Sequence, residues 1–186
     1  MAMRLTPEIG VHLRGLADQV LVNPYPGATI SRAQREMLAT AVSAANDCFF
    51  CMDSHAAHAT ALLERDGTAD EIAKLDTLKV GESDGFDPKM QALLHIARTV
   101  RRDPRKLKSA DIDAACGAGA TDGDVQLAVL IASAFSMYNR LVDGFRARTP
   151  ANVEVYRDRA AEIAEHGYSA PPQPPAAVAA KASGAG

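Results

Sequence analysis

The stretch that decides the fold is residues 31–55, which read SRAQREMLATAVSAANDCFFCMDSH. Ser31 and Gln34 form the pattern of a capping box, so a helix is predicted to begin here. Apolar residues then recur at helical spacing and predict one buried stripe, made of Met37, Leu38, Ala41, Val42 and Ala45. Asn46 and Asp47 interrupt this pattern, and Asp47 is a suitable N-cap for the helix that carries the cysteines. The stretch therefore predicts an antiparallel helical hairpin.

Helical signals continue on both sides of this hairpin. Prolines at helix starts and capping Asp, Ser and Thr residues predict further helices, over residues 7–22, 47–64, 68–78, 88–100, 109–116, 122–148 and 151–165. Only 5% of the residues are aromatic, and no segment has the pattern of a strand. The prediction is an all-α domain over residues 1–168, a compact bundle of about seven to eight helices. Residues 169–186 are rich in proline, alanine and glycine and are predicted to form a disordered tail.

The overall composition excludes several classes of function. The formal net charge is −3, which provides no basic field to attract nucleic acid or an anionic membrane. No signal peptide is evident, and no window approaches the ~20 apolar residues of a membrane span. Three cysteines in 186 residues are too few for a secreted disulfide scaffold. We therefore expect a cytoplasmic protein, in which a close cysteine pair serves catalysis or metal binding.

The cysteine pair has the spacing of a redox centre. Cys48, Cys51 and His55 are at positions i, i+3 and i+7, so on a helix they share one face. A helix N-terminus stabilises a thiolate and lowers its pKa, and the imidazole can exchange a proton with the nearer thiol. A thiolate, a partner thiol and a base are thus predicted to meet within two turns.

Other interpretations of these residues remain open. The two cysteines and His55 could bind zinc, with a fourth ligand from His58 or Asp53. A thioredoxin-like centre is disfavoured because the chain lacks a βαβ context. The third cysteine, Cys116, is expected to be a small buried core residue, and His58 is expected at the surface or at an interface.

Glu36 is added to the candidate site by the geometry of the hairpin. Residues at similar depth from the turn at Asn46 face one another when two helices pack antiparallel. His55 lies roughly 12 Å and Glu36 roughly 16 Å along their helices from that turn. The carboxylate of Glu36 is therefore placed to orient the imidazole of His55 and to exchange its proton.

These residues resemble the alkylhydroperoxidase D-like (carboxymuconolactone decarboxylase-type) superfamily, in its pattern Glu…Cys-x-x-Cys-x-x-x-His. The resemblance covers roughly residues 5–165 and implies an all-α peroxidase that is a homo-oligomer, a trimer or hexamer. It also implies that Cys51 attacks a hydroperoxide, that Cys48 resolves the product to a disulfide, and that Glu36 and His55 form a proton relay. No cofactor is implied. The implied partners are an alkyl or organic hydroperoxide and a dithiol reductant, such as a lipoyl protein or a peroxiredoxin-type protein.

One position departs from the resemblance. Well-studied members have a histidine directly before the second cysteine, where this chain has Phe50. With Phe49 it makes the mouth of the site apolar, which favours organic hydroperoxides over hydrogen peroxide. Two alternative functions are a lactone decarboxylase, which does not need the cysteine pair, and a non-catalytic redox sensor or zinc-binding oligomer.

Polar residues further along the chain have structural roles in this interpretation. Asn139, Arg140 and Asp143 lie on the long helix predicted near the C-terminus and are expected to hold helices together, although they could also border the cysteines. Tyr138 is expected to pack rather than to react.

Overall fold

The structure is a computed structural model that describes residues 7–66, 68, 71–152 and 154–169. These residues form eight α-helices and one short 3₁₀ helix, and none of them forms a strand. In chain order the elements are α2 (Pro7–Leu21), α3 (Arg32–Ala45), α4 (Phe49–Asp66), α5 (Lys74–Lys79), α6 (Pro88–Arg102), η2 (Pro104–Lys106), α7 (Ser109–Gly117), α8 (Asp122–Gly144) and α9 (Glu154–His166). The predicted all-α fold is confirmed. The predicted tail lies outside the described residues from residue 170 onward.

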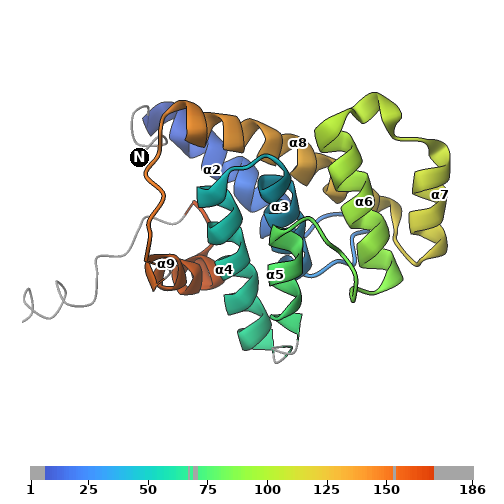
Figure 1. Ribbon diagram of the computed structural model, residues 1–186, viewed down its shortest axis with the longest axis horizontal. Helices are drawn as coiled ribbons and strands as arrows, with labels where there is room; N and C mark the ends of the chain where they lie inside the picture. The colour runs from blue at the N-terminus through green and yellow to red at the C-terminus, as the bar shows by residue number, and fades with distance from the viewer. Residues whose placement is uncertain (1–6, 67, 69–70, 153, 170–186) are drawn as a thin grey trace, which may run out of the picture.

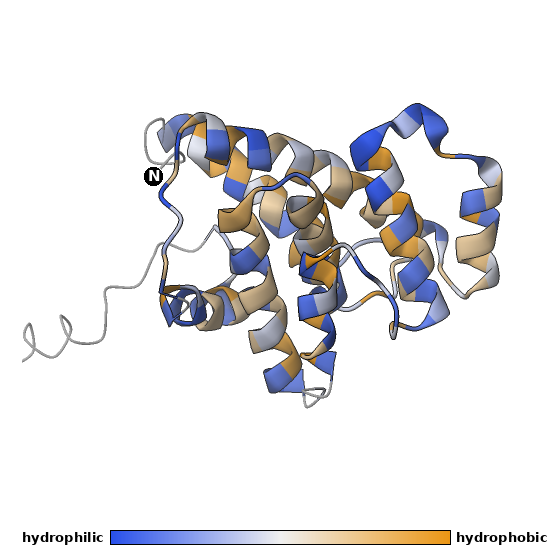
Figure 2. Ribbon diagram, viewed as in Figure 1, coloured by the Kyte–Doolittle hydropathy of each residue, from blue (hydrophilic) through white to orange (hydrophobic). Residues whose placement is uncertain are grey.

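The long helix α8 organises the bundle. It packs against α2, α3 and α6, while α4 packs against both α3 and α9. In Figure 1, α9 lies at one end of the molecule and α6 with α7 at the other. Figure 2 shows hydrophobic and hydrophilic residues interspersed along the helices, the pattern expected of helices with one buried side.

The core lies where α3, α6 and α8 meet. Its largest fully buried side chains include Met37, Leu38, Leu93, Leu94, Ile96, Leu127, Ile131 and Phe135. Each such side chain contributes about 1.5–3 kcal/mol when it leaves water. By length and composition α8 is also apolar enough to cross a membrane, but 56% of its most apolar window is buried inside the protein. The apolar side chains of α8 pack in the core of the protein.

The capping box at the start of α3 is confirmed. The Ser31 hydroxyl accepts a hydrogen bond from the Gln34 backbone N–H at 3.2 Å, and the Gln34 side-chain oxygen accepts one from the Ser31 N–H at 2.9 Å. Two of the backbone donors at the helix start are thereby satisfied. The start of α3 is determined locally, by four consecutive residues.

The turn between α3 and α4 differs from the prediction. Asp47 is not the N-cap of α4, because it has a left-handed backbone with a φ of 56° and the helix begins two residues later, at Phe49. The Asp47 N–H donates to Ala44 O and the Cys48 N–H donates to Ser43 O. This is a Schellman closure, which satisfies the last carbonyls of α3 and requires a left-handed residue at this position. Asp47 thus ends the first helix, and Cys48 occupies the capping position of the second.

Other helix boundaries differ as well. The helix predicted over 68–78 is shorter, Lys74–Lys79, and residues 69–70 lie outside the described part. The last helix begins at Glu154 rather than at residue 151. Helix α8 ends at Gly144, four residues before the predicted end, because Arg146 adopts a φ of 54° and closes the helix with the same pair of backbone bonds.

The N-terminus of α8 is anchored by Asp124. Its carboxylate accepts hydrogen bonds from the backbone N–H groups of Thr29 and Ile30, and Lys89 Nζ lies 3.0 Å away. The preceding residue, Gly123, allows the loop to approach, because a Cβ there would lie 2.5 Å from the Ala28 nitrogen. The α2–α3 loop is therefore held against α8 by backbone contacts that leave no room for a side chain.

Candidate active site

The two cysteines lie together at the start of α4. Cys48 is at the capping position and Cys51 is in the first turn, with exposed fractions of 0% and 4%. They form a small apolar cluster with Val142 of α8, and Phe50 and Ala147 pack against it. Both thiols are free. The pair is therefore enclosed by the start of α4 and the end of α8.

The two thiols of the pair differ in pKa. The hydrogen-bonding interaction with the Cys51 thiol, more than any other contact, lowers the pKa of Cys48. The same interaction with Cys48, followed by burial, raises the pKa of Cys51. The side chain of Asn139 acts to lower the pKa of Cys51, and Asp143 acts to raise the pKa of Cys48. The first proton to leave this pair is that of Cys48, and Cys51 remains the donor to the resulting thiolate.

Asn139 has both of the roles considered for it. Its amide N–H donates to the Ser43 hydroxyl at 3.0 Å, and its amide oxygen accepts from Asn46 at 2.8 Å. Arg101 of α6 donates to the Asn46 side chain at 2.6 Å and also to the Ala45 carbonyl. The hairpin turn is thus clamped between α6 and α8, and the same Asn139 lies beside Cys51.

Two neighbours of Asn139 behave as expected for structural residues. Tyr138 packs against Phe135 and donates its hydroxyl proton to the Leu13 carbonyl at 2.7 Å. Arg140 is exposed and bonds to the Ser136 carbonyl of its own helix. Neither contacts the thiols through these bonds.

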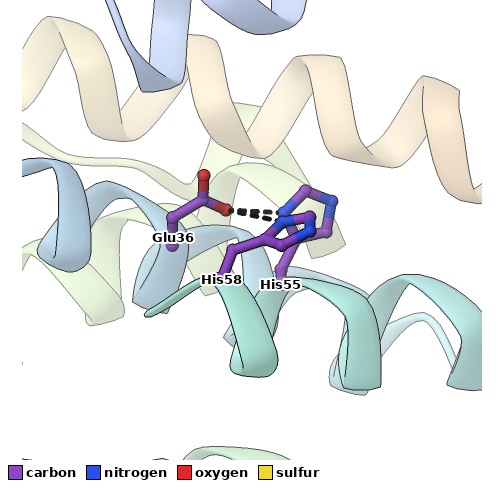
Figure 3. A group of neighbouring side chains, drawn as sticks. All are labelled: Glu36, His55 and His58. Carbon is purple, nitrogen blue, oxygen red and sulfur yellow. Dashed lines mark hydrogen bonds and ion pairs between the residues drawn. The ribbon is translucent and has the colours of Figure 1, made fainter. Parts of the chain in front are cut away.

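Glu36 and His55 are brought together across the α3–α4 pair. Glu36 Oε2 lies 2.7 Å from His55 Nδ1, and the carboxylate side chain is fully buried (Figure 3). Burial acts to raise the pKa of Glu36, but the hydrogen bond and charge interaction with His55, and then with His58, outweigh it and hold the pKa at about 2. Glu36 is therefore an ionised carboxylate in the protein interior, directed at two imidazoles.

His58 was predicted at the surface or at an interface, but it is buried within the protein. Its exposed fraction is 2%, and its Nδ1 lies 3.8 Å from Glu36 Oε2 (Figure 3). The spacing of His55 and His58, three residues apart on α4, is compatible with one face of a helix. The i, i+3 spacing of the two histidines was the one feature of the sequence that could have predicted the burial of His58. It does so only when Glu36 is known to lie opposite both rings.

Tyr168 was missed entirely. Its hydroxyl donates to Glu36 Oε1 at 2.7 Å and lies 2.9 Å from His58 Nδ1. Burial, followed by the charge of Glu36, raises the pKa of Tyr168 well above its usual range. The residue is held by its backbone N–H, which donates to Asp18 of α2 at 2.6 Å. No local sequence pattern predicts this contact, because it joins residues 132 positions apart in the chain.

The cysteine cluster is covered by aromatic side chains. The Phe50 ring lies 6.0 Å from that of Tyr156 on α9, and Phe49 is 62% exposed at the surface beside it. The Tyr156 hydroxyl is buried and has no hydrogen-bond partner within the described residues. Its pKa is raised to about 12 by burial and then by Asp53 and Cys51. A cavity of about 330 Å³ opens between α4, α5 and α9, and its lining includes Tyr156 and Asp53.

One further expectation from the sequence is wrong, and one alternative is not supported by the fold. Cys116 is exposed on α7 rather than buried, because the apolar face of that short helix is taken by residues such as Ala115. The group of metal-binding side chains found among the described residues consists of Glu36, His55 and His58, with donor atoms within 4.8 Å of one another. The fold therefore does not gather the zinc set considered earlier, two cysteines with His55.

Similarity to solved structures agrees with this architecture. A peroxidase-related protein from Ralstonia eutropha JMP134, described as an alkylhydroperoxidase AhpD core, is 22% identical with a TM-score of 0.69, over 82% of this chain and 77% of that one. A protein of unknown function from Agrobacterium tumefaciens, described as a putative antioxidant defence protein AhpD, is 18% identical with a TM-score of 0.63, over 80% and 95%.

A third similar structure is that of a protein described by a different activity. The debrominase Bmp8, in a variant bound to 2,3,4-tribromopyrrole, is 16% identical with a TM-score of 0.61, over 85% of this chain and 79% of that one. A search among curated proteins finds no match. The sequence model of one family matches residues 7–99, which is half of the chain and contains Glu36, both cysteines of the pair and His55. The protein belongs to the carboxymuconolactone decarboxylase family.

Proposed function

We propose that this protein is a thiol-dependent peroxidase that reduces organic hydroperoxides through a dithiol–disulfide cycle of Cys48 and Cys51. The observation that carries the proposal is a pair of buried free thiols, three residues apart at the start of a helix, where the interaction with Cys51 lowers the pKa of Cys48. A structural pair would have no use for a stabilised thiolate, whereas the reduction of a peroxide begins with one. The buried Glu36–His55 pair, one helical turn further along α4, supplies proton transfer.

The first half of the reaction oxidises Cys51. The cycle begins with Cys48 as a thiolate, and the proton of Cys51 passes along the thiol–thiol hydrogen bond to it, which leaves a thiolate on Cys51. This thiolate attacks the terminal peroxide oxygen, so that an S–O bond forms while the O–O bond breaks. The leaving alkoxide takes the proton from Cys48 and departs as an alcohol. Cys51 is now a sulfenic acid and Cys48 is again a thiolate.

The second half forms the disulfide. The Cys48 thiolate attacks the sulfur of the Cys51 sulfenic acid, so that the S–S bond forms and the S–O bond breaks. The departing hydroxide takes one proton and leaves as water. That proton comes from Nε2 of the imidazolium form of His55, which becomes a neutral imidazole that keeps its Nδ1 proton, hydrogen-bonded to Glu36, and later takes up a proton from solvent. A dithiol reductant then restores both thiols by exchange.

The surroundings of this cycle are also part of the proposal. The reductant is a dithiol protein, either a lipoyl protein or a peroxiredoxin-type partner, and the cycle operates in a reducing compartment such as the cytoplasm. The active form is a homo-oligomer, a trimer or hexamer. Exposed apolar side chains on α2 and α8, among them Ile9, Val11, Leu130 and Met137, support association between copies.

A thiol count tests the proposal directly. The reduced protein contains three thiols, and one equivalent of cumene hydroperoxide is expected to remove two of them, leaving Cys116. Titration with a chromogenic disulfide under denaturing conditions measures the number. The matched control is Cys116→Ser, in which the count should fall from two to zero. Consumption of the peroxide without any loss of thiol would refute the cycle.

The aromatic cover predicts a substrate preference. Phe50 packs on the cysteine cluster, and Phe49 is exposed beside it. An aromatic substrate displaces water from an apolar entrance and buries apolar surface there. Cumene hydroperoxide should therefore be reduced faster than hydrogen peroxide. The ratio of the two rates measures the preference, and Phe50→His should lower this ratio. Phe49→Ala serves as the comparison for loss of exposed apolar surface alone. Equal rates for the two peroxides in the wild-type protein would contradict this prediction.

A further inference from the structure

We propose that Glu36, His55 and His58, with the hydroxyl of Tyr168 as a fourth donor, form a binding site for a divalent transition-metal ion of the Zn²⁺ type. The three charged or ionisable side chains come from α3 and α4, and Tyr168 comes from the segment after α9. Figure 3 shows both imidazole rings turned toward the same carboxylate. His55 lies one helical turn along α4 from Cys51, and the site uses neither cysteine.

The separations between donor atoms suit a single ion. His55 Nδ1 lies 2.7 Å and His58 Nδ1 lies 3.8 Å from Glu36 Oε2. The Tyr168 hydroxyl lies 2.7 Å from Glu36 Oε1, 2.9 Å from His58 Nδ1 and 3.3 Å from His55 Nδ1. Ligands at about 2.0–2.1 Å from a tetrahedral zinc ion are roughly 3.3 Å apart. The observed values lie on both sides of this separation, so small rotations of the side chains would enclose an ion.

The chemical state of the donors also suits a cation. Interactions with the histidines keep Glu36 ionised in the interior, and burial, the largest influence, lowers the pKa of His58 and keeps its imidazole neutral. A neutral imidazole and a carboxylate are the forms that bind metal. On binding, the ion coordinates Nδ1 of each histidine, and the single proton of each neutral imidazole resides on Nε2.

Hydrogen bonding within the protein does not account for His58. Its Nε2 is buried and has no partner among the described residues, so only one of its two ring nitrogens is used. Buried polar side chains are normally satisfied at both ends. The ring nitrogen that does interact, Nδ1, is the one that faces Glu36 and the Tyr168 hydroxyl, where the ion is proposed to bind.

A bound metal ion would compete with the proton transfer that the proposed reaction requires of Glu36 and His55. An ion on Glu36 and His55 Nδ1 removes the proton that these two groups share, so Zn²⁺ should inhibit the peroxidase; only this consequence rests on the proposed function. Binding itself is independent of thiol chemistry. It is therefore measured in a protein in which all three cysteines are replaced by serine, which also removes the competing thiolate ligands.

The experiment is a Zn²⁺ titration of this cysteine-free protein against a chromogenic chelator. We expect one equivalent to bind, and His58→Gln or Glu36→Gln to weaken binding by at least about 100-fold, because loss of an outer-shell partner alone costs about 10–100-fold. The matched control is His12→Gln, which removes an exposed histidine of α2 and should leave the affinity unchanged. Tyr168→Phe, which removes one oxygen only, should weaken binding by a smaller factor.

A spectroscopic measurement covers the case in which a variant does not fold. Co²⁺ added to the cysteine-free protein should give the intense visible absorption of a tetrahedral site, and Zn²⁺ should abolish it. Thermal unfolding of each variant establishes which of them are folded. Absence of Zn²⁺ binding by the cysteine-free protein overturns the proposal, and so does equal affinity in His58→Gln and His12→Gln.

Discussion

Cys51→Ser is expected to abolish hydroperoxide consumption, with a loss of at least about 10³-fold, because a serine hydroxyl cannot replace an activated thiolate. The substitution changes one atom in a buried cluster, so the fold should be retained. The measurement is the initial rate with cumene hydroperoxide and a small dithiol as reductant. The matched control is Cys116→Ser, which removes an exposed thiol on α7 and should keep the full rate.

Cys48→Ser separates the attacking thiol from the resolving thiol. If Cys51 attacks, this variant should still react once with hydroperoxide and should accumulate a sulfenic acid that a dimedone-type probe labels at Cys51. It should not turn over, because no neighbouring thiol resolves the intermediate. Since Cys48 is the more acidic thiol of the pair, its loss should also slow the first step. Labelling of Cys48 in the Cys51→Ser variant, with none of Cys51 in the other, would reverse the assignment.

Asp124→Asn is expected to produce the largest loss of stability. The Asp124 carboxylate lies at the N-terminus of α8, where backbone N–H groups of the α2–α3 loop and Lys89 converge on it. An amide leaves Lys89 without its counter-charge and turns an NH₂ group toward donors, and breaking a buried charged pair costs about 3–5 kcal/mol. Urea unfolding at neutral pH measures the loss. Asp122→Asn is the matched control, because Asp122 is exposed in the same turn of helix.

The same residue makes the stability depend on pH. Burial acts to raise the pKa of Asp124, but hydrogen bonds from the backbone N–H groups of Thr29 and Thr121, and then from Lys89, hold it well below the usual range. A lowered pKa in the folded state contributes stability that is complete above the unfolded value of about 3.9 and is lost as the pH falls toward the folded value. The difference between wild type and Asp124→Asn should therefore shrink below about pH 4. A difference that stays constant between pH 7 and pH 3 would show that Asp124 acts through packing alone.

The helices were predictable wherever a few neighbouring residues determine them. The capping box of Ser31 with Gln34 needs only its own four residues, and the cysteine pair needs only the spacing of one turn. The position of Glu36 was predictable as well, because antiparallel packing places residues at similar distances from the turn opposite each other. The distance of 2.7 Å between Glu36 Oε2 and His55 Nδ1 agrees with this placement. What these residues do chemically remains a proposal.

The helix ends and the buried polar contacts depended on the tertiary structure. Asp47 is a good N-cap by residue type, yet closing α3 and holding its turn against Asn139 requires it to be left-handed. The burial of His58 and the approach of Tyr168 to Glu36 were equally invisible, because residue type and spacing do not report which surface a distant segment will cover.

By itself, the sequence determined that the chain folds into helices and that two thiols, a histidine and a glutamate lie on the two helices of one hairpin, since helical periodicity acts over a few residues. The tertiary structure alone decided which thiol is the more acidic, and it buried both His55 and His58. It also placed Tyr168 against the glutamate. These properties depend on desolvation and on hydrogen bonds between segments far apart in the chain, and only the packed fold creates them.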